Sequence, residues 1–172
     1  MNPEEFRAKF PLILKWIEQT LAAHAPMARP VASLSFPRLP RYFSPVTLTT
    51  AKVVAVEVVP LPPLTAFGLG RFADFEQMDA NGITYLDTFF VKAHLSGNER
   101  LHFHELVHIV QWSLLGPERF LALYADALER FGYRDSPLEA MACRLEGRFQ
   151  QGGVAFSVEQ AVRGELTALV EG

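Results

Sequence analysis

The spacing of the apolar residues changes at about residue 96, and this change constrains the fold more than any other feature. Before it, Val54, Val56 and Val58 alternate with their neighbours, as is typical of a β-strand. After it, apolar residues recur with the period of about 3.6 residues that is typical of helices. Strands followed by helices, rather than alternating with them, predict an α+β fold.

The same change divides the chain into three parts of what we expect to be a single domain, residues 1–172. A chain of 172 residues is long enough for one core and short for two. We expect an N-terminal helix and a proline-rich connector over residues 1–45. A small, mostly antiparallel sheet should follow over 46–95, and a helical half over 96–172.

Local signals predict the first elements. An Asn-Pro pair near the N-terminus is typical of a helix start, and the helix should reach about His24 with a kink or break at Pro11. Runs rich in valine, threonine and aromatic residues are typical of strands. They predict strands over 46–59 and 83–91 and a short strand over 64–72.

Composition excludes several classes of protein. Sixteen Lys and Arg against nineteen Asp and Glu give a net charge of -3, so no positive field is available to attract nucleic acid. The longest stretch without a charged residue, 58–70, is shorter than the roughly 20 residues that span a bilayer. An acidic N-terminal segment and a single cysteine, Cys143, favour a cytoplasmic protein without an internal disulfide. We expect Cys143 to be a small buried hydrophobe.

One predicted helix carries a motif that can bind a metal ion. It starts at the capping-box pair Ser96 and Glu99, ends before Gly116, and contains the sequence HELVH at residues 104–108. Residues four apart lie on one face of a helix, so both histidines can bind one zinc ion. Glu105 lies beside that face, where a carboxylate can accept a proton from a water on the metal.

The alternative is a helix whose histidines are simply buried and hydrogen-bonded in the core. A shuffled chain of this composition would contain the motif with a probability of about 0.01, which is small but not negligible. Burying His104, His108 and Glu105 on one patch is costly unless something pairs with them. The motif therefore favours a metal site over a purely structural helix.

Two histidines do not complete a catalytic zinc site, so a third ligand is needed. The metzincin pattern requires a histidine where this chain has Leu114, which excludes that branch. Glu139 lies in the first turn of a helix that Ser136 can cap, and it is either the third ligand or only the glutamate of a capping box. The small side chains that follow it would let this helix approach the histidine helix closely. Glu129, expected on the solvent-facing side of its helix, is the second candidate.

The HELVH motif, an interval of about thirty residues and the sequence SPLEAMA at 136–142 together resemble the zincin metallopeptidases. The resemblance is specifically to the gluzincin branch and its small single-domain bacterial members, over residues 96 to about 147. The resemblance implies a zincin-like fold whose sheet precedes the active-site helix. It also implies that the two motif histidines and Glu139 bind Zn2+ and that Glu105 is the catalytic base. Glu129 stays open as the third ligand, because its spacing is nearer to that of thermolysin-like enzymes.

The implied function is a zinc metallopeptidase that hydrolyses peptide bonds of a peptide or protein substrate through a metal-activated water. By the same resemblance, Tyr133 is a candidate donor to the oxyanion of the transition state. A strand over 83–91 at the sheet edge could align an extended peptide. His102 should point away from the metal, because it lies about 200° round the helix from His104. The alternative function is a non-catalytic zincin-like module that binds metal or peptide.

Overall fold

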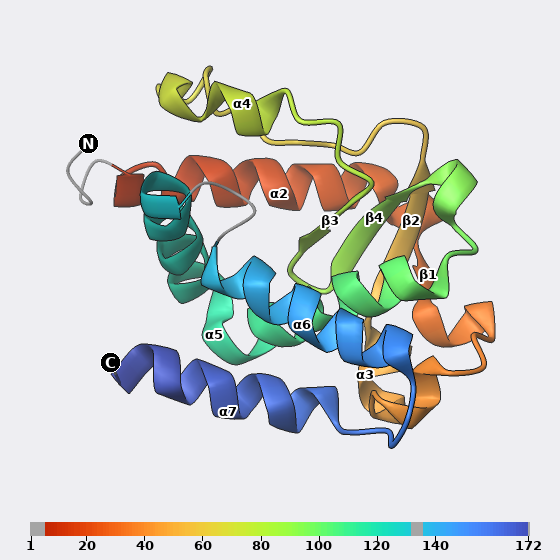
Figure 1. Cartoon of the computed structure of the whole chain (residues 1–172). Coiled ribbons are helices and arrows are strands. Elements are labelled where there is room, and N and C mark those ends of the chain that lie inside the picture. Colours follow the sequence, from red (N-terminus) through yellow and green to blue (C-terminus); the bar gives the residue numbers. More distant parts are fainter. Residues whose placement is uncertain (1–5, 132–135, 172) are drawn as a thin grey trace.

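The computed structural model describes residues 6–131 and 136–171 of the chain. In this part, helices lie around one small sheet (Figure 1), so the predicted α+β class is confirmed. The helices are α2 (Phe10–His24), α3 (Pro45–Thr50), α4 (Ala73–Glu76), α5 (Glu99–Phe131), α6 (Pro137–Gln151) and α7 (Val158–Glu171). Short 3-10 turns lie at η1 (Ala25–Met27), η2 (Val31–Leu34), η3 (Leu39–Arg41), η4 (Gly70–Phe72) and η5 (Ala93–Leu95). Among these described helices, none has both the length and the apolar character needed to cross a membrane.

The strands of the described chain form one four-stranded sheet in the order β1-β2-β4-β3. They are β1 (Arg29–Pro30), β2 (Lys52–Val56), β3 (Gly82–Tyr85) and β4 (Thr88–Lys92). The outer pairs are antiparallel, whereas β2 and β4 run parallel. The sheet is therefore mixed, with more antiparallel than parallel pairs, and β3 lies at one edge.

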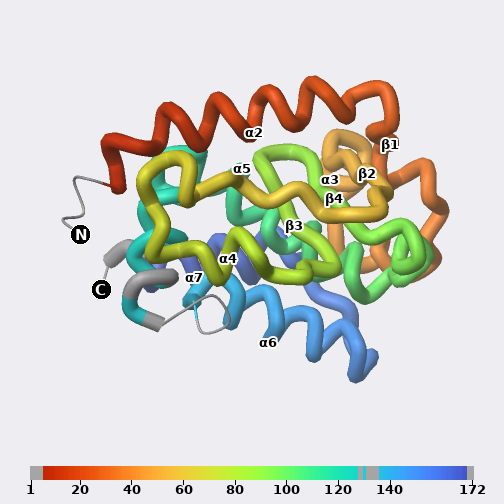
Figure 2. Tube along the Cα trace, turned by 90° about the horizontal axis from the view of Figure 1, so that it is seen from above, coloured from red at the N-terminus to blue at the C-terminus, as the bar shows by residue number. Residues whose placement is uncertain are grey.

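Helix α5 lies in the middle of the molecule and contacts β3, β4, α2, α6 and α7. Seen from above (Figure 2), α2 and α6 lie on opposite sides of it. Its side chains Phe103 and Leu106 are fully buried in the core. Phe103 stacks on Phe149 of α6 with the ring centroids 4.4 Å apart, which holds these two helices together.

For the first half of α5, the predicted capping residue is wrong and the predicted end is correct. The side chain of Asn98, and not that of Ser96, caps the helix by accepting a 3.2 Å hydrogen bond from the backbone N–H of Leu101. The carboxylate of Glu99 instead accepts hydrogen bonds from two backbone N–H groups of the proline-rich connector. The predicted end is confirmed, because Gly116 leaves the helical conformation with φ 72° and ψ 166°.

The predicted N-terminal helix ends at His24, and it is split just before Pro11 as expected, because residues 6 and 7 are helical and residues 8 and 9 form a turn. Helix α2 begins at Phe10, so Pro11 lies in its first turn. There the missing N–H of proline has no partner to lose, so the proline is compatible with the start of α2 but not with a helix that continues through residues 8 and 9. The Asn-Pro pair lies outside the described residues.

None of the three strand predictions holds over its full predicted range. Residues 46–59 do not form one strand: Ser44 and Pro45 start helix α3, and only Lys52–Val56 form strand β2. The Ser44 hydroxyl accepts a 3.1 Å hydrogen bond from the N–H of Thr47, and this cap outweighs the strand preference of the valine and threonines that follow. Residues 64–72 form turns and η4 instead of a strand.

The predicted strand over 83–91 is a hairpin of β3 and β4, because the chain reverses between Tyr85 and Thr88. Leu86 adopts a positive φ of 56° in this tight turn, a conformation that its side chain does not signal in the sequence. The sheet also includes residues outside the range predicted for it. Strand β1 comes from the proline-rich connector, outside the expected 46–95.

Candidate metal centre

Three side chains converge between α5 and α6. The Nε2 atoms of His104 and His108 lie 3.2 Å apart. The carboxylate of Glu139 brings one oxygen to 3.4 Å from Nε2 of His104 and the other to 3.3 Å from Nε2 of His108. Ligands at the corners of a tetrahedron with metal–nitrogen bonds of 2.0–2.1 Å stand about 3.3 Å apart. The three donor groups therefore match one face of a tetrahedral metal site.

Helix geometry explains why these donors meet. His104 and His108 are one turn apart on α5, on the side that α6 covers. Helix α6 starts at the cap Ser136, whose hydroxyl accepts a 3.2 Å hydrogen bond from the N–H of Glu139. The carboxylate of Glu139 points to the histidines. The backbone N–H of Glu139 therefore belongs to the cap of α6, while its carboxylate lies next to the two histidines.

Two other predicted residues are not placed. The backbone of Glu129 belongs to α5, but its side chain lies outside the described part of the chain. Tyr133 lies in the segment 132–135, which is also outside it. The roles assigned to both residues stay predictions.

Further acceptors orient the two imidazoles. Nδ1 of His104 lies 3.0 Å from a carboxylate oxygen of Glu146, which also forms an ion pair with Arg100. Nδ1 of His108 lies 2.7 Å from the side-chain oxygen of Gln111. With Nδ1 as the donor in each bond, the neutral imidazoles would present Nε2 to a metal ion, as in many metal sites.

Sequence reasoning did not assign these orienting residues, although signals for them exist. Glu146 stands seven residues after Glu139, which puts both carboxylates on one face of α6. Gln111 stands three residues after His108, on the same side of α5. The metzincin pattern would have glycine where this chain has Gln111. Comparison with that pattern does not predict the hydrogen bond between Gln111 and His108.

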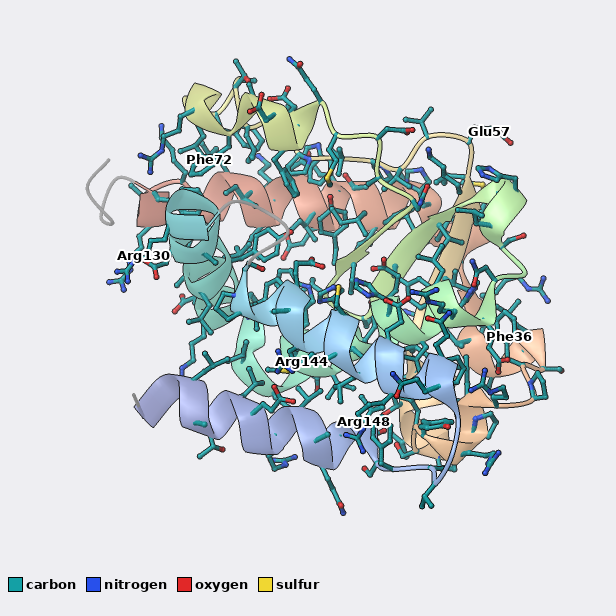
Figure 3. All side chains as sticks on the ribbon, viewed as in Figure 1. Phe36, Glu57, Phe72, Arg130, Arg144 and Arg148 are labelled. Carbon is teal, nitrogen blue, oxygen red and sulfur yellow. The ribbon has the colours of Figure 1, made fainter. Side chains whose placement is uncertain are left out.

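The outer side of α6 is held by other contacts. Arg144 forms an ion pair with Glu165 of α7. The guanidinium carbon of Arg148 lies 3.7 Å from the ring centroid of Phe156. Figure 3 shows both arginines on the side of α6 that faces α7 and the loop before it. These contacts keep α6 in place while its other side brings Glu139 to α5.

Glu105 is buried next to the centre and is held by the edge strand β3. Its side chain is 4% exposed, and its Oε2 accepts a 2.7 Å hydrogen bond from the hydroxyl of Thr84. The indole N–H of Trp112 donates to the backbone oxygen of Thr84 at 3.1 Å, which fixes the strand against α5. Position 82 must be small, because a Cβ on Gly82 would come to 2.5 Å from Oε1 of Glu105. Sequence reasoning found none of these three contacts.

The electrostatics of the three donors reflect their proximity. Burial lowers the pKa of His104, but its hydrogen bonds to Glu139 and Glu146 outweigh that effect and raise the pKa to about 11. Burial also opposes the charge of His108, yet the charge of Glu139 raises the pKa of that imidazole. Burial raises the pKa of Glu139, and the two histidines outweigh it and hold the pKa far below its usual range. The site therefore favours a carboxylate next to positive charge.

Glu105 has the opposite environment. Burial raises the pKa of its carboxyl, and the neighbouring histidines and the Thr84 hydroxyl only partly offset this. A carboxyl with a raised pKa binds a proton more readily near neutral pH than an ordinary glutamate does. This property suits a group that accepts and then releases a proton.

The structure tests two predictions about nearby residues, His102 and Cys143. His102 points away from the centre as expected: its Nδ1 lies 2.9 Å from the backbone oxygen of Asn98, and its ring packs against Phe89. Cys143 is exposed, so the prediction of a buried cysteine is wrong. It lies on the same face of α6 as Glu139 and Glu146 and, with His104 and Glu146, forms a second group of possible ligands.

Comparison of the chain with protein families, with curated proteins and with solved structures finds no match. The geometry of the centre therefore carries the functional argument. The likeness to zincins and the cytoplasmic location stay predictions from the sequence.

Proposed function

We propose that the chain is a zinc-dependent metallopeptidase with a zincin-like fold of the gluzincin type. The observation that carries the proposal is the triangle of donor atoms from His104, His108 and Glu139, with separations of 3.2 to 3.4 Å. Two imidazoles and one carboxylate are a donor set used by catalytic zinc sites, and three protein ligands leave a fourth position open. The fit in both chemistry and spacing supports zinc.

A bound zinc ion supplies a Lewis acid that polarises a carbonyl group and makes water nucleophilic near neutral pH. Glu105 performs the proton transfers, because it is the carboxylate beside the centre that does not pair with the two Nε2 atoms. Its Oε2 is held by the Thr84 hydroxyl, which leaves Oε1 to accept the proton of the attacking water and deliver it to the leaving amine. Glycine at position 82 leaves room for this oxygen, because a Cβ there would come to 2.5 Å from Oε1.

The edge strand β3 supplies a place for an extended substrate. Within the described residues, β3 pairs with β4 on one side, and its other edge has no strand partner. A peptide can add to such an edge by main-chain hydrogen bonds. The alignment that the sequence led us to expect over 83–91 is therefore proposed for β3, Gly82–Tyr85, the strand that also holds Glu105.

The experiment that tests the proposal compares wild type with Glu105→Gln, both loaded with zinc. The variant should bind zinc as wild type does, because Glu105 is not a ligand. Its hydrolysis of unfolded protein should fall by about 10²–10⁴, the usual effect of losing a general base. Equal hydrolysis by the two proteins would contradict the proposed role of Glu105. Zinc binding without any hydrolysis that a chelator suppresses would support the non-catalytic module instead.

A further inference from the structure

A second group of metal-ligating side chains lies next to the candidate metal centre, along the same seam between α5 and α6. Cys143 and Glu146 of α6 and His104 of α5 each bring a possible ligand atom to within 4.8 Å of the other two. Cys143 and Glu146 stand one helical turn apart, so they share a face of α6. Cys143 is exposed, which makes this group accessible from solvent. We call it the outer group, and His104, His108 and Glu139 the inner group.

His104 belongs to both groups, but it faces them with different ring nitrogens. Its Nε2 lies 3.2 Å from His108 and 3.4 Å from Glu139, on the inner side. Its Nδ1 lies 3.0 Å from the carboxylate of Glu146, on the outer side. A neutral imidazole carries one proton and one lone pair, so only one of the two nitrogens can bind a metal ion at a time.

The position of the imidazole proton therefore selects the group that His104 serves. When Nε2 binds an ion in the inner group, Nδ1 keeps the proton and donates it to Glu146. When Nδ1 binds an ion in the outer group, the proton moves through solvent to Nε2, which then has no lone pair for an inner ion. Full occupancy of one group thus excludes full occupancy of the other.

The donors of the outer group suit a thiophilic divalent ion. A thiol gives up its proton to solvent when it binds such an ion, so Cys143 and Glu146 together supply two negative charges to balance the ion. Thiolate sulfur favours zinc and softer ions over magnesium or calcium. Glu146 also pairs with Arg100, whose side chain is 51% exposed and can turn into water at little cost.

The outer group is looser than the inner group. Nitrogen, oxygen and sulfur ligands of one tetrahedral zinc ion stand about 3.3–3.6 Å apart, so some of the outer donors must approach one another by up to about 1.5 Å. Rotation of the Cys143 and Glu146 side chains can supply this movement, because neither of them is buried. We therefore expect the outer group to bind zinc more weakly than the inner group and to lose it during purification.

We propose that Cys143, Glu146 and Nδ1 of His104 form an outer binding site for a thiophilic divalent ion such as zinc or cadmium, and that this site and the inner centre exclude each other. The proposal rests on the inner centre of the proposed function and adds a means of regulating it. An ion in the outer site takes His104 from the inner centre, and an ion in the inner centre takes it from the outer site.

Cadmium absorbance tests the outer site without any need for catalysis. The chain has a single cysteine, so the ultraviolet charge-transfer band of a cadmium–thiolate bond reports binding at Cys143 alone. His108→Ala disables the inner centre and keeps all three outer ligands. We expect the metal-free variant to develop the band and to saturate at about one cadmium per chain. Absence of the band in folded protein would overturn the proposal. Circular dichroism is recorded first, and Glu139→Gln replaces His108→Ala if that variant does not fold.

A matched pair of substitutions distinguishes a site of several ligands from a lone thiol. In the His108→Ala background, Glu146→Gln removes an outer ligand and should weaken cadmium binding at the thiolate by about tenfold or more. Glu165→Gln makes the same change of charge at an acid that pairs with Arg144, and it should leave the affinity within about twofold. Equal affinities with and without Glu146 would show that the thiol binds cadmium alone, which would overturn the proposal.

Zinc-loaded wild type tests the exclusion between the two sites. Because the inner zinc holds Nε2 of His104, we expect the cadmium–thiolate band to need at least about tenfold more cadmium than in His108→Ala. A band at the same cadmium concentration in both proteins would overturn the exclusion. If wild type binds no zinc but the variant shows the band with its dependence on Glu146, the proposed peptidase function fails and the outer site stands. If zinc-loaded wild type hydrolyses peptides and the variant shows no band, the outer site fails and the proposed function stands.

Discussion

The hydroxyl of Thr84 donates a 2.7 Å hydrogen bond to Oε2 of Glu105, across twenty-one positions of sequence. This bond ties the edge strand to the carboxylate beside the candidate metal centre. Strand β3 thereby has two tasks in the proposed enzyme: it offers an edge to the substrate and it fixes the general base. A substrate that pairs with β3 would contact the strand that positions Glu105.

Thr84→Val should separate these tasks, because valine has nearly the shape of threonine but no hydroxyl. We expect a loss of stability of about 1–3 kcal/mol, since a buried carboxylate oxygen is left without a donor. The kcat for peptide hydrolysis should fall while zinc content stays at the wild-type value. Urea unfolding, zinc analysis and steady-state kinetics measure these effects. Thr84→Ser should restore kcat, and failure to do so would contradict the positioning role.

Gly82→Ala should displace Glu105, because the added Cβ would lie 2.5 Å from Oε1. We expect hydrolysis to fall by about tenfold or more, as for loss of an oriented general base, with zinc retained. Gly97→Ala is the control, since a Cβ at Gly97 meets no atom within 4 Å. If Gly82→Ala is as active as wild type, Oε1 is not the proton acceptor.

The third ligand can be assigned by separating metal binding from capping. Glu139→Gln should lose zinc, because the carboxylate is the anionic ligand in the triangle of His104, His108 and Glu139. Ser136→Ala removes the cap, so it should cost about 1 kcal/mol of stability and leave zinc content unchanged. Both are measured by elemental analysis and thermal unfolding. Zinc loss in Glu129→Gln, with zinc kept in Glu139→Gln, would assign the third ligand to Glu129.

Zinc affinity should depend on pH through His104. Hydrogen bonds to Glu139 and Glu146 outweigh burial and raise the pKa of His104 to about 11, so the metal-free site holds a proton there near neutral pH. The raised pKa stabilises the metal-free fold fully below the unfolded value of about 6.5, and this contribution is lost as the pH rises toward the folded pKa.

Zinc must displace this proton, so its affinity should rise with pH by about tenfold per unit for each proton released. Competition with a chelator at about pH 6 and about pH 8 measures this dependence. Equal affinities at the two pH values would contradict the protonated state assigned to His104.

The sequence allowed prediction of the features that depend on neighbours along the chain. The helical spacing of His104 and His108, the end at Gly116 and the cap at Ser136 are local, and the structure confirms each of them. The position of Glu139 next to the histidines also follows from local rules, once the two helices are assumed to pack closely.

Some of the missed features depend on contacts between distant segments, and others depend on local geometry that the residue types do not signal. Thr84 and Gly82 give no sign in the sequence that they lie against Glu105, because the contact forms only when β3 packs on α5. The split of 83–91 into two strands depends on a positive φ at Leu86, which leucine rarely adopts. The helix at Pro45–Thr50 arises because a local cap outweighs the strand preference of its residues.

The central claim is that His104, His108 and Glu139 hold a zinc ion, and the metal content of the purified protein tests it most directly. Elemental analysis of protein prepared without chelator should give about one zinc per chain, and His104→Ala and His108→Ala should each give less than about a tenth of that. Less than about a tenth of a zinc per chain in wild type, or full zinc in either histidine variant, would contradict the account.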